Sequence, residues 1–576
     1  MDQQPRKPPR RKDNRVILQF DYDCFYAQVF ENKNPALKTR PLGIKQKNIL
    51  ATCNYNARKL GVGKLMLISE AKRICPGLVL VDGEDLTPFR DVSKTLFNFL
   101  RSHSWNGKVE RLGFDEVFMG RLCLSTTQYH ITLTVPDVTD MIDYNILCVN
   151  SNCLDKSFFH LSEKDPERGF PCDLTVVAGC VSGPATPDAN PDDRTHLRLR
   201  FGSHLAHYLR SKLETEFGYT STCGISTNKL LSKLVGSCNK PRNQTTLLAW
   251  KDDDVIAFMD AHKTRKVPGL GFKIAMLLES HVLGYEIEAD SHSFDSHITV
   301  GQVRQHPSMS PGFLETLLKG PGAERGVGAR VWGLLHGVDE AEVKEASDIP
   351  SQVSIEDTFK GLETIPQITE ELHKLSCSLI RRLRVDLVVV DESADVPGFR
   401  KWIARPKTLR LSIRSWPTRQ GSYSSQAMNF NRVSRSGPLP TFVFDLEADM
   451  ESLAQRLVAE ALLPLLRRLQ AEQGQNHKWN LQLLNICAAN MVVGAADDKM
   501  GAGRDIAFMF KHQDEALRPW KVTQSSDEDR RDADIADSTN PAPVEDEDSE
   551  GDVTWDSTTN AADMKTIHRK TIYAKR

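Results

Sequence analysis

The chain has 576 residues, which predicts roughly four domains at about 150 residues each. Hydrophobic residues make up 40% and charged residues 26%, an ordinary balance that excludes a collagen, a coiled coil and a wholly disordered chain. The sequence has no apolar run of about 18 residues, and its start, MDQQPRKPPRRKD, lacks the apolar core of a secretory signal. We therefore expect an intracellular protein with no membrane partner, whose 12 cysteines stay reduced.

Charge is distributed unevenly along the chain. The net charge is -2, but residues 525–563 hold fourteen Asp or Glu against two Arg, a local charge of -12, so the remainder carries -2 minus -12, or +10. A basic body leaves room for a polyanionic partner such as nucleic acid. We expect residues 497–576 to form a mostly disordered tail, acidic at 525–563. Residues 1–14 are expected to form a basic disordered arm that suits a location in the nucleus.

The N-terminal half predicts an alternation of strands and helices. Apolar runs between polar residues indicate strands, and apolar residues three and four apart indicate helices. Residues 124–195 contain several Pro and Asp and show no clear period, so we expect a variable insertion there. The other expected elements are a buried strand running into a helix at 16–31, a strand at 49–53, a short helix ending at Gly61, two strands around a turn at 107–120, a helix at 196–217, and a strand and helix at 220–238.

The C-terminal half has a different pattern of predicted helices and strands. Short helical stretches broken by VPGLG and PGAERGVG indicate a compact helical domain to about residue 340, and residues 341–355 are typical of a linker. From 356 to 496, a long helix at 366–385, alternating strands and a second helix at 447–470 predict an α/β domain.

Acidic residues at two strand ends form the sharpest pattern in the sequence. Asp21 and Asp23 end the first strand, and Asp115 and Glu116 are adjacent at the tip of the later turn. If the two strands are neighbours, these carboxylates converge and suit Mg²⁺. Two such ions, about 3.5–4 Å apart, can bridge an attacking hydroxyl and a leaving pyrophosphate. The spacing alone favours the alternative, in which these are solvated turn residues with a structural role.

Five sequence segments favour a metal-binding role for these carboxylates over a structural one. FDYDCFYAQVFE, CNYNARKLGV, ERLGFDEVF, GISTNKLLSKLVGSCNKP and SIEDTF follow one another in this order, and together they resemble the signature segments of the Y-family translesion DNA polymerases. The resemblance runs from about residue 16 to 245 and resumes more weakly to about 495. It implies an α+β multidomain fold, a right-hand polymerase of palm, fingers and thumb joined to an α/β little finger domain. The implied boundaries are palm at 15–24 and 91–245, fingers at 25–90, a helix-hairpin-helix thumb at 246–340, a linker at 341–355 and a little finger at 356–496.

The resemblance assigns roles to the carboxylates. It implies that Asp21, Asp115 and Glu116 are catalytic and hold two Mg²⁺ ions, with Mn²⁺ as the alternative ion. The main-chain carbonyl of Tyr22 is implied as a further metal ligand. Asp23 is expected to point to the other side of the strand and to be structural.

Cationic residues are implied at the triphosphate of the incoming nucleotide. The residues that match the family's triphosphate contacts are Tyr55, Arg58 and Lys240. Arg58 follows Tyr55 by three residues, so on a helix both can reach one ligand. Lys229 and Lys233 are spaced i, i+4 on another predicted helix, and for that pair a solvated helix face is the favoured interpretation.

The resemblance also implies the walls of the nucleotide pocket. Tyr26 matches the aromatic steric gate, whose ring lies where a ribose 2′-hydroxyl would sit; a core aromatic is the alternative. The segment that covers the templating base comprises Gln46, Lys47, Ile49 and Ala51. Ala51 is smaller than the branched residue expected in a narrowed pocket.

Two stretches are candidates for gripping DNA. The turn VPGLG at 267–271 resembles a helix-hairpin-helix turn, in which Gly269 and Gly271 let a phosphate approach backbone amides; a simple helical connection is the alternative. Residues 401–435 contain eight Lys or Arg and no Asp or Glu, which favours sequence-independent phosphate contacts over a plain solvated strand. The arginines expected to bind DNA there are Arg410, Arg414, Arg432 and Arg435.

The resemblance implies a template-dependent DNA polymerase that extends a primer past damaged bases, and we expect no proofreading because no exonuclease-like domain is apparent. Its expected partners are primer-template DNA and a deoxynucleoside triphosphate, and the resemblance adds a sliding clamp, ubiquitin and other translesion polymerases. The alternatives are another Y-family lesion-bypass polymerase, a deoxycytidyl transferase, or a non-catalytic DNA-binding scaffold. The intact carboxylates favour an enzyme over the scaffold.

Overall fold

The computed structural model describes residues 9–11, 15–105, 108–120, 141–146, 157–183 and 194–493, apart from gaps at 163, 166, 174, 250, 288–297, 321–323, 346, 348, 391–397, 417–431 and 474–478. The predicted acidic tail, most of the basic arm and parts of the predicted insertion therefore lie outside the described residues. Within those residues, no helix has the length and apolar character needed to cross a membrane. None of the nine cysteines in the described part forms a disulfide.

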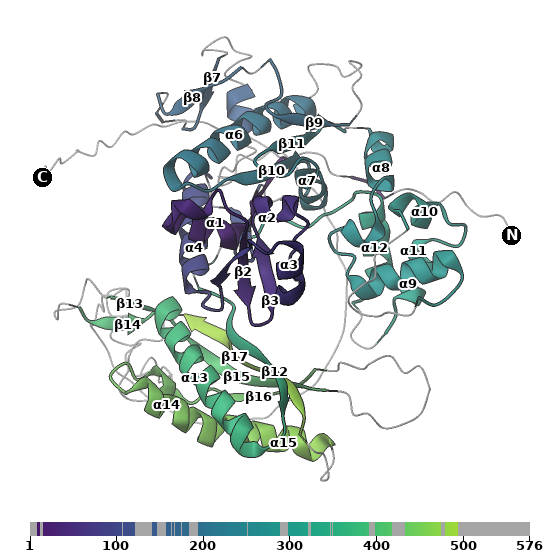
Figure 1. The fold of residues 1–576 in the computed structure, drawn as a ribbon. Coiled ribbons are helices and arrows are strands. Elements are labelled where there is room, and N and C mark those ends of the chain that lie inside the picture. The colour runs from purple at the N-terminus through teal and green to yellow at the C-terminus, as the bar shows by residue number, and fades with distance from the viewer. Residues whose placement is uncertain are drawn as a thin grey trace, which may run out of the picture. The chain divides into compact units, whose positions relative to one another are not determined.

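A six-stranded sheet forms the centre of the N-terminal part (Figure 1). The strand order is β5 (Val109–Leu112), β6 (Glu116–Met119), β1 (Ile17–Tyr22), β10 (Ser221–Ser226), β11 (Gln244–Leu247) and β9 (Cys180–Ser182). Leu18 and Phe20 of β1 are fully buried in the core that the helices α4 (Thr87–Ser102) and α6 (Arg194–Phe217) form with one face of the sheet. The shorter α7 (Lys229–Gly236) packs against β1 and β10 from the other face.

A smaller three-stranded sheet follows β1 in the chain. Its order is β3 (Ile49–Cys53), β2 (Leu42–Gln46) and β4 (Val79–Asp82). The accompanying helices are α1 (Phe25–Lys33), the 3-10 turn η1 (Pro35–Leu37), α2 (Tyr55–Lys59) and α3 (Ile68–Ile74). Leu50, Ala57 and Val62 form a small apolar core of their own here. The strand expected at 49–53 and the short helix before Gly61 are both present, and Gly61 adopts a left-handed φ of 90°.

The next region of the chain is helical. Its elements are α8 (Asp252–Asp260), the 3-10 turn η2 (Thr264–Lys266), α9 (Phe272–Leu283), α10 (Val300–Gln305), α11 (Pro311–Leu317) and α12 (Val327–Leu335). Side chains such as Met259, Leu278 and Val331 are fully buried in a common core. Ser310 and Thr299 cap α11 and α10 by accepting a backbone hydrogen bond three residues on, which fixes where these short helices begin.

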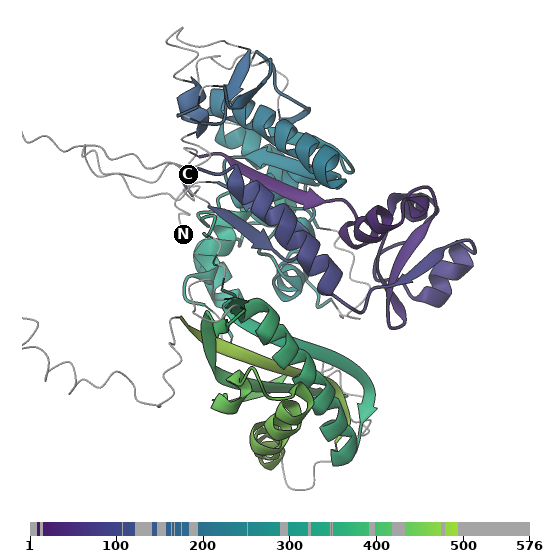
Figure 2. The same ribbon diagram turned by 90° about the vertical axis from the view of Figure 1, so that its left-hand side faces the viewer.

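The C-terminal part is an α/β unit with a four-stranded sheet. The strand order is β12 (Gln352–Leu362), β17 (Leu481–Val493), β15 (Ala404–Ser415) and β16 (Val433–Pro438). Its helices are α13 (Ile365–Leu387), α14 (Met450–Leu457) and α15 (Leu463–Gln473), with shorter elements at β13 (Val388–Val390), β14 (Arg400–Trp402) and η3 (Thr441–Phe444). The helices bury one face of the sheet in a single apolar core, and Figure 2 shows the long α13 beside the strands.

Three elements differ from the sequence-based expectations. The segment expected as an insertion contains a hairpin of β7 (Phe158–His160) and β8 (Gly169–Pro171), and it also supplies β9, which pairs in parallel with β11 at the edge of the central sheet. Strand β12 begins at Gln352, so part of the expected linker is a strand. The helix expected at 447–470 is interrupted by the π-helical turn η4 (Val458–Leu462). A strand of three residues such as β9 is too short for its alternation to be visible in the sequence.

Candidate active site

The register of the central sheet brings the predicted catalytic carboxylates together. Asp21 of β1 lies directly opposite Glu116 of β6. Asp115 immediately precedes Glu116 in the turn after β5, and its carbonyl accepts a 2.9 Å hydrogen bond from the backbone N–H of Tyr22. Neighbouring strands therefore hold Asp21, Asp115 and Glu116 at one end of the sheet, as the sequence predicted.

The electrostatics of this cluster favour a cation. The pKa of Asp115 is raised to about 6, first because protein atoms displace water around its carboxyl, and then because Asp21 and Glu116 add negative charge nearby. Two lysines offset that charge: Lys240 Nζ lies 2.5 Å from Asp21 Oδ2, and Lys233 Nζ lies 2.5 Å from Glu116 Oε2. The site is thus a cluster of mutually repelling carboxylates with ammonium groups at its edge.

The contact of Lys233 corrects an expectation. The spacing of Lys229 and Lys233 predicts a solvated helix face, but Lys229 Nζ lies 2.8 Å from Glu110 Oε1, and Lys233 reaches the acidic cluster. Helix α7 approaches the sheet closely because glycines meet at the contact: a Cβ added to Gly224 would lie 2.6 Å from the amide nitrogen of Gly236. The i, i+4 spacing gave no signal of this role, since it does not reveal which face of a helix meets the sheet.

Asp23 is structural, although not for the expected reason. Its buried carboxylate accepts 2.9 Å hydrogen bonds from the Thr222 hydroxyl and from the backbone N–H of Arg242. Thr222 is the β10 partner of Asp21, so the side chain lies on the same side of the sheet as Asp21 rather than on the opposite side. Because it joins two strands to the loop after Lys240, Asp23 helps to position that lysine.

Tyr26 lies beside the carboxylates. Its ring stacks on Phe89, with centroids 4.0 Å apart and planes 9° apart. Burial raises the pKa of the Tyr26 hydroxyl, and the Asp115 carboxylate raises it further. One face of the ring is thus held by the fully buried Phe89, and the hydroxyl lies within electrostatic range of Asp115. The stacking gives the ring a packing role, and the steric-gate role stays a prediction.

Tyr55 and Arg58 lie together on the short helix α2. The Arg58 guanidinium lies over the Tyr55 ring, 4.7 Å from its centroid, and its Nε donates to the carbonyl of Cys53 at 3.2 Å. A buried asparagine starts this helix: the Asn54 side chain accepts from Ala57 N at 3.0 Å.

The Asn54 amide also reaches the rest of this region. Its Nδ2 donates to Glu31 Oε1 at 2.9 Å and to the carbonyl of Arg40 at 2.8 Å, and its Oδ1 accepts from Leu42 N at 3.0 Å. Sequence reasoning missed this residue. The signal was an Asn immediately before a helical stretch, which is a common helix cap.

The residues expected around the templating base belong to the hairpin of β2 and β3. Ile49 and Ala51 are half-buried and alternate with the fully buried Leu50, so they share the opposite face of β3. Gln46 ends β2, and its side-chain amide donates to the carbonyl of Gly83 at 2.8 Å.

Lys47 lies at the tip of the same hairpin. It adopts a left-handed φ of 51°, and its backbone N–H donates to Glu84 Oε1 at 3.0 Å. Its ammonium group pairs with Asp357 and donates to the carbonyl of Thr358, both on β12. The structure thus directs the Lys47 side chain to the C-terminal sheet.

The C-terminal sheet has one apolar and one polar face on β15. Leu409, Leu411 and Ile413 are fully buried against the helices. Arg410 and Arg414 alternate with them and lie on the opposite face, where Arg410 Nη2 donates to Gln352 Oε1 at 3.1 Å. The alternation predicted for this strand is confirmed.

The other two arginines differ from each other in position. Arg432 Nη2 lies 2.9 Å from Glu356 Oε2 of β12, so the polar face is not free of acids, as residues 401–435 alone had suggested. Arg435 pairs with Leu411 across β15 and β16, which places it on the helix side of the sheet, away from Arg410 and Arg414. The sequence does not predict the side on which Arg435 lies, because that side depends on the register between β15 and β16.

The two glycines of the VPGLG turn, Gly269 and Gly271, differ in their surroundings. Gly269 has a left-handed φ of 88°, and an added Cβ would lie 2.9 Å from Leu334 Cδ1. Gly271 is exposed and caps α9 without a side chain, and no heavy atom lies within 4 Å of an added Cβ. Packing thus accounts for Gly269, whereas Gly271 leaves the first amides of α9 open to a ligand.

The donor set of the acidic cluster fits a divalent cation. Three carboxylates, one on β1, one on β6 and one in the turn before β6, supply the hard oxygen ligands that Mg²⁺ takes, and Mn²⁺ suits the same donors. Burial, and after it the charges of Asp21 and Glu116, raises the pKa of Asp115, and a bound cation would relieve the repulsion among the three carboxylates. Fold and site therefore define an α+β multidomain protein with a carboxylate centre for divalent ions.

Comparison with known families agrees with this class. The model of the impB/mucB/samB family matches residues 20–237, and that of its C-terminal domain matches residues 350–500. The chain belongs to this family, which is that of the Y-family DNA polymerases.

Several relatives carry the same name. DNA polymerase iota of Homo sapiens is 31% identical over 484 residues, which cover 84% of this chain and 53% of that protein. The corresponding Mus musculus protein is 31% identical over 84% of this chain and 55% of its own length, and the Drosophila melanogaster protein is 33% identical over 65% and 42%. Residues 45–66, 75–90 and 109–116 predict this likeness, and the prediction is confirmed. The chain spans about half the length of these relatives.

Proposed function

We propose that this chain is a template-dependent DNA polymerase that adds deoxynucleotides to a primer 3′-hydroxyl and copies damaged template bases without proofreading. The observation that carries the proposal is the pairing of Asp21 with Glu116, with Asp115 adjacent and Lys240 at the cluster. Family membership and the names of the relatives support the same reaction. The substrates are primer-template DNA and a deoxynucleoside triphosphate, and the basic arm supports a nuclear location.

In this proposal, the central sheet is the palm, the three-stranded sheet with its helices the fingers, the helical region the thumb, and the C-terminal α/β unit the little finger. Asp21, Asp115 and Glu116 hold the divalent ions, Mg²⁺ in the first instance, together with the Tyr22 carbonyl. When bound, such ions activate the attacking hydroxyl and stabilise charge on the leaving pyrophosphate. Clamp, ubiquitin and polymerase partners stay predictions.

The protein's own side chains then have distinct tasks. Lys240 and Arg58 neutralise the triphosphate, and the Tyr55 ring orients the Arg58 guanidinium. Lys240 now pairs with Asp21, and it would be available to the phosphates if that carboxylate held a divalent ion instead. Tyr26, held flat against Phe89, blocks the space of a ribose 2′-hydroxyl. Arg410, Arg414 and Arg432 contact DNA phosphates from the polar face of the C-terminal sheet.

A primer-extension assay with the full chain tests the proposal. We expect Asp115→Asn and Glu116→Gln to abolish extension, and to leave primer-template affinity within about twofold, because phosphate contacts elsewhere dominate binding. Asp91→Asn, an exposed carboxylate on α4, is the matched control and should extend normally. Extension by either active-site variant at the wild-type rate would contradict the proposal.

Single-nucleotide insertion opposite each template base separates the alternatives. A polymerase inserts a nucleotide that depends on the template, whereas a deoxycytidyl transferase inserts dC opposite every base. A chain that binds DNA and inserts nothing would be a scaffold.

A further inference from the structure

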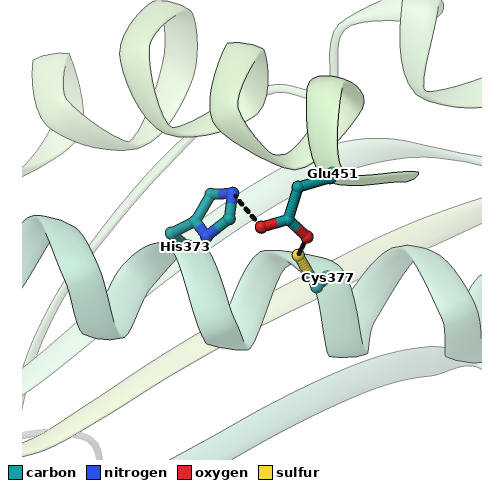
Figure 3. A group of neighbouring side chains, drawn as sticks. All are labelled: His373, Cys377 and Glu451. Carbon is teal, nitrogen blue, oxygen red and sulfur yellow. Dashed lines mark hydrogen bonds and ion pairs between the residues drawn. The ribbon is translucent and has the colours of Figure 1, made fainter. Parts of the chain in front are cut away.

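A cluster of mixed donor atoms lies in the C-terminal α/β unit, far along the chain from the carboxylates. Figure 3 shows the side chains of His373 and Cys377, from α13, and Glu451, from α14, pointing toward one another. His373 Nε2 lies 3.4 Å from Glu451 Oε1, and the Cys377 thiol donates a 3.2 Å hydrogen bond to Glu451 Oε2. One imidazole nitrogen, one sulfur and one carboxylate oxygen all lie within 4.8 Å of one another.

We propose that His373, Cys377 and Glu451 form a binding site for one divalent transition-metal ion, with Zn²⁺ as the preferred ion, that joins α13 to α14. The site goes beyond the polymerase function proposed above and uses none of its residues. Sulfur and imidazole donors select Zn²⁺ over Mg²⁺, which prefers oxygen ligands only.

The spacing of the donors is close to that of a tetrahedral site. Metal–ligand bonds of about 2.0–2.3 Å at a tetrahedral angle place two ligand atoms about 3.3–3.8 Å apart. His373 Nε2 lies 3.4 Å from Glu451 Oε1, and the Cys377 sulfur lies 3.2 Å from the other oxygen, Oε2. Rotation of the exposed Glu451 carboxylate is needed to present one oxygen to both, and the three donors, which lie within 4.8 Å of one another, then close to that range. Three protein ligands leave the fourth position to water, and the Glu451 side chain, 71% exposed, leaves the site accessible from solvent.

The protein backbone holds these three residues in place without an ion. His373 and Cys377 are spaced i, i+4 and therefore lie on one face of α13. The opposite face is anchored in the core by fully buried residues such as Leu372 and Leu379. The start of α14 is fixed because the Asp449 side chain accepts a 3.0 Å hydrogen bond from Ser452 N. A preformed arrangement lowers the entropy cost of binding an ion.

Two cations lie near these donors: Arg381, whose charge acts on the Cys377 thiol, and Lys374. Lys374, the next residue after His373, lies 2.9 Å from both Glu370 and Glu371, so its charge is balanced on its own side of the helix. The Cys377 thiol donates its proton in a hydrogen bond to Glu451, and an ion bound at the sulfur would displace that proton. The helices also lie on the face of the sheet opposite Arg410 and Arg414, so an ion there leaves the polar face free.

Cobalt titration of the full-length protein tests the site directly. Excess Mg²⁺ is added to occupy the carboxylate centre, and Co²⁺ is used because a thiolate ligand gives it a charge-transfer absorption band in the near ultraviolet. We expect one equivalent of Co²⁺ to produce this band and Zn²⁺ to remove it by displacement. Cys377→Ser should abolish the band, and His373→Ala and Glu451→Gln should weaken Co²⁺ binding by at least about tenfold.

Two control variants and a stability measurement complete the test. Cys238→Ser, at an exposed cysteine elsewhere, and Glu447→Gln, at an acid 92% exposed, should behave as the unmodified protein. Zn²⁺ should raise the thermal midpoint by about 2–4 °C, an increase lost in Glu451→Gln, whose exposed side chain is not needed for folding. A missing band, a band that survives in Cys377→Ser, or an equal Zn²⁺ shift in Glu451→Gln would each overturn the proposal.

Discussion

Replacing Tyr26 separates a packing role from a selective one. Tyr26→Ala removes a ring that stacks on Phe89 with centroids 4.0 Å apart. Such a pair contributes about 0.5–1.5 kcal/mol, and loss of roughly 100 Å² of buried apolar surface costs about 2.5 kcal/mol more. We expect the free energy of unfolding to fall by about 3–4 kcal/mol, which lowers the thermal midpoint by roughly 6–15 °C.

Selectivity should change separately from stability. If the ring blocks the ribose position, Tyr26→Ala should raise the efficiency of ribonucleotide insertion relative to deoxyribonucleotide by at least about tenfold, a change of about 1.4 kcal/mol. The control is Tyr26→Phe, which keeps the ring and its stacking and should leave the ratio unchanged.

The assay is steady-state primer extension with matched ribo- and deoxyribonucleotides, read as the ratio of the two kcat/KM values. This ratio does not depend on the fraction of active protein, so a destabilised variant can still be interpreted. A lower thermal midpoint with an unchanged ratio would show that Tyr26 is only a packing residue.

Three further predictions follow from the described contacts. Replacing Arg410 and Arg414 by Ala should weaken primer-template binding and reduce the salt slope by about one unit per lost phosphate contact, measured by anisotropy, whereas Arg435→Ala on the helix side should leave the slope unchanged; equal effects would refute the assigned faces. Asn54→Ala removes the cap of α2 and should lower the free energy of unfolding by about 1–3 kcal/mol. It should also raise the KM for the nucleotide more than the control Asn56→Ala does, and equal KM values would exclude a positioning role for Asn54. Because the pKa of Asp115 is raised to about 6, Mn²⁺ must displace a proton below that pH, so its affinity should fall by up to about tenfold per pH unit there and level off above it; a calorimetric affinity that is constant through about pH 6 would contradict this.

The sequence predicts those features correctly that depend on the residue pattern of a single strand or turn. The hydrophobic run before Asp21, the turn at Asp115 and the alternation along β15 are local patterns, and the structure contains all three. It failed where the outcome depends on which elements meet. Lys233 contacts Glu116 because α7 packs against the sheet through Gly224 and Gly236. The spacing of residues within the helix does not predict that contact.

The pairing of strands that are distant in the chain could not be predicted from the sequence either. Strand β9 joins the central sheet through β11, and Arg435 lies on the helix side because Leu411 is its partner. A shift of one residue in register reverses the face of every side chain, so a strand's facing cannot be known before its partner is. Asp23 is a different case, since residues two apart on a strand share a face, and the alternation itself places Asp23 on the side of Asp21, where it contacts Thr222.

The contact between Gly224 and Gly236 sets how much sequence variation this centre tolerates. A single methyl group at Gly224 would lie 2.8 Å from the Gly236 Cα and would push α7 off the sheet, moving Lys233 away from Glu116. In a saturation library selected for activity, Gly224 should therefore be as intolerant as the carboxylates, although it bears no reactive group. Function-altering changes in this chain need not map to residues that touch a substrate, and variants at this glycine belong in the same class as variants at Asp21.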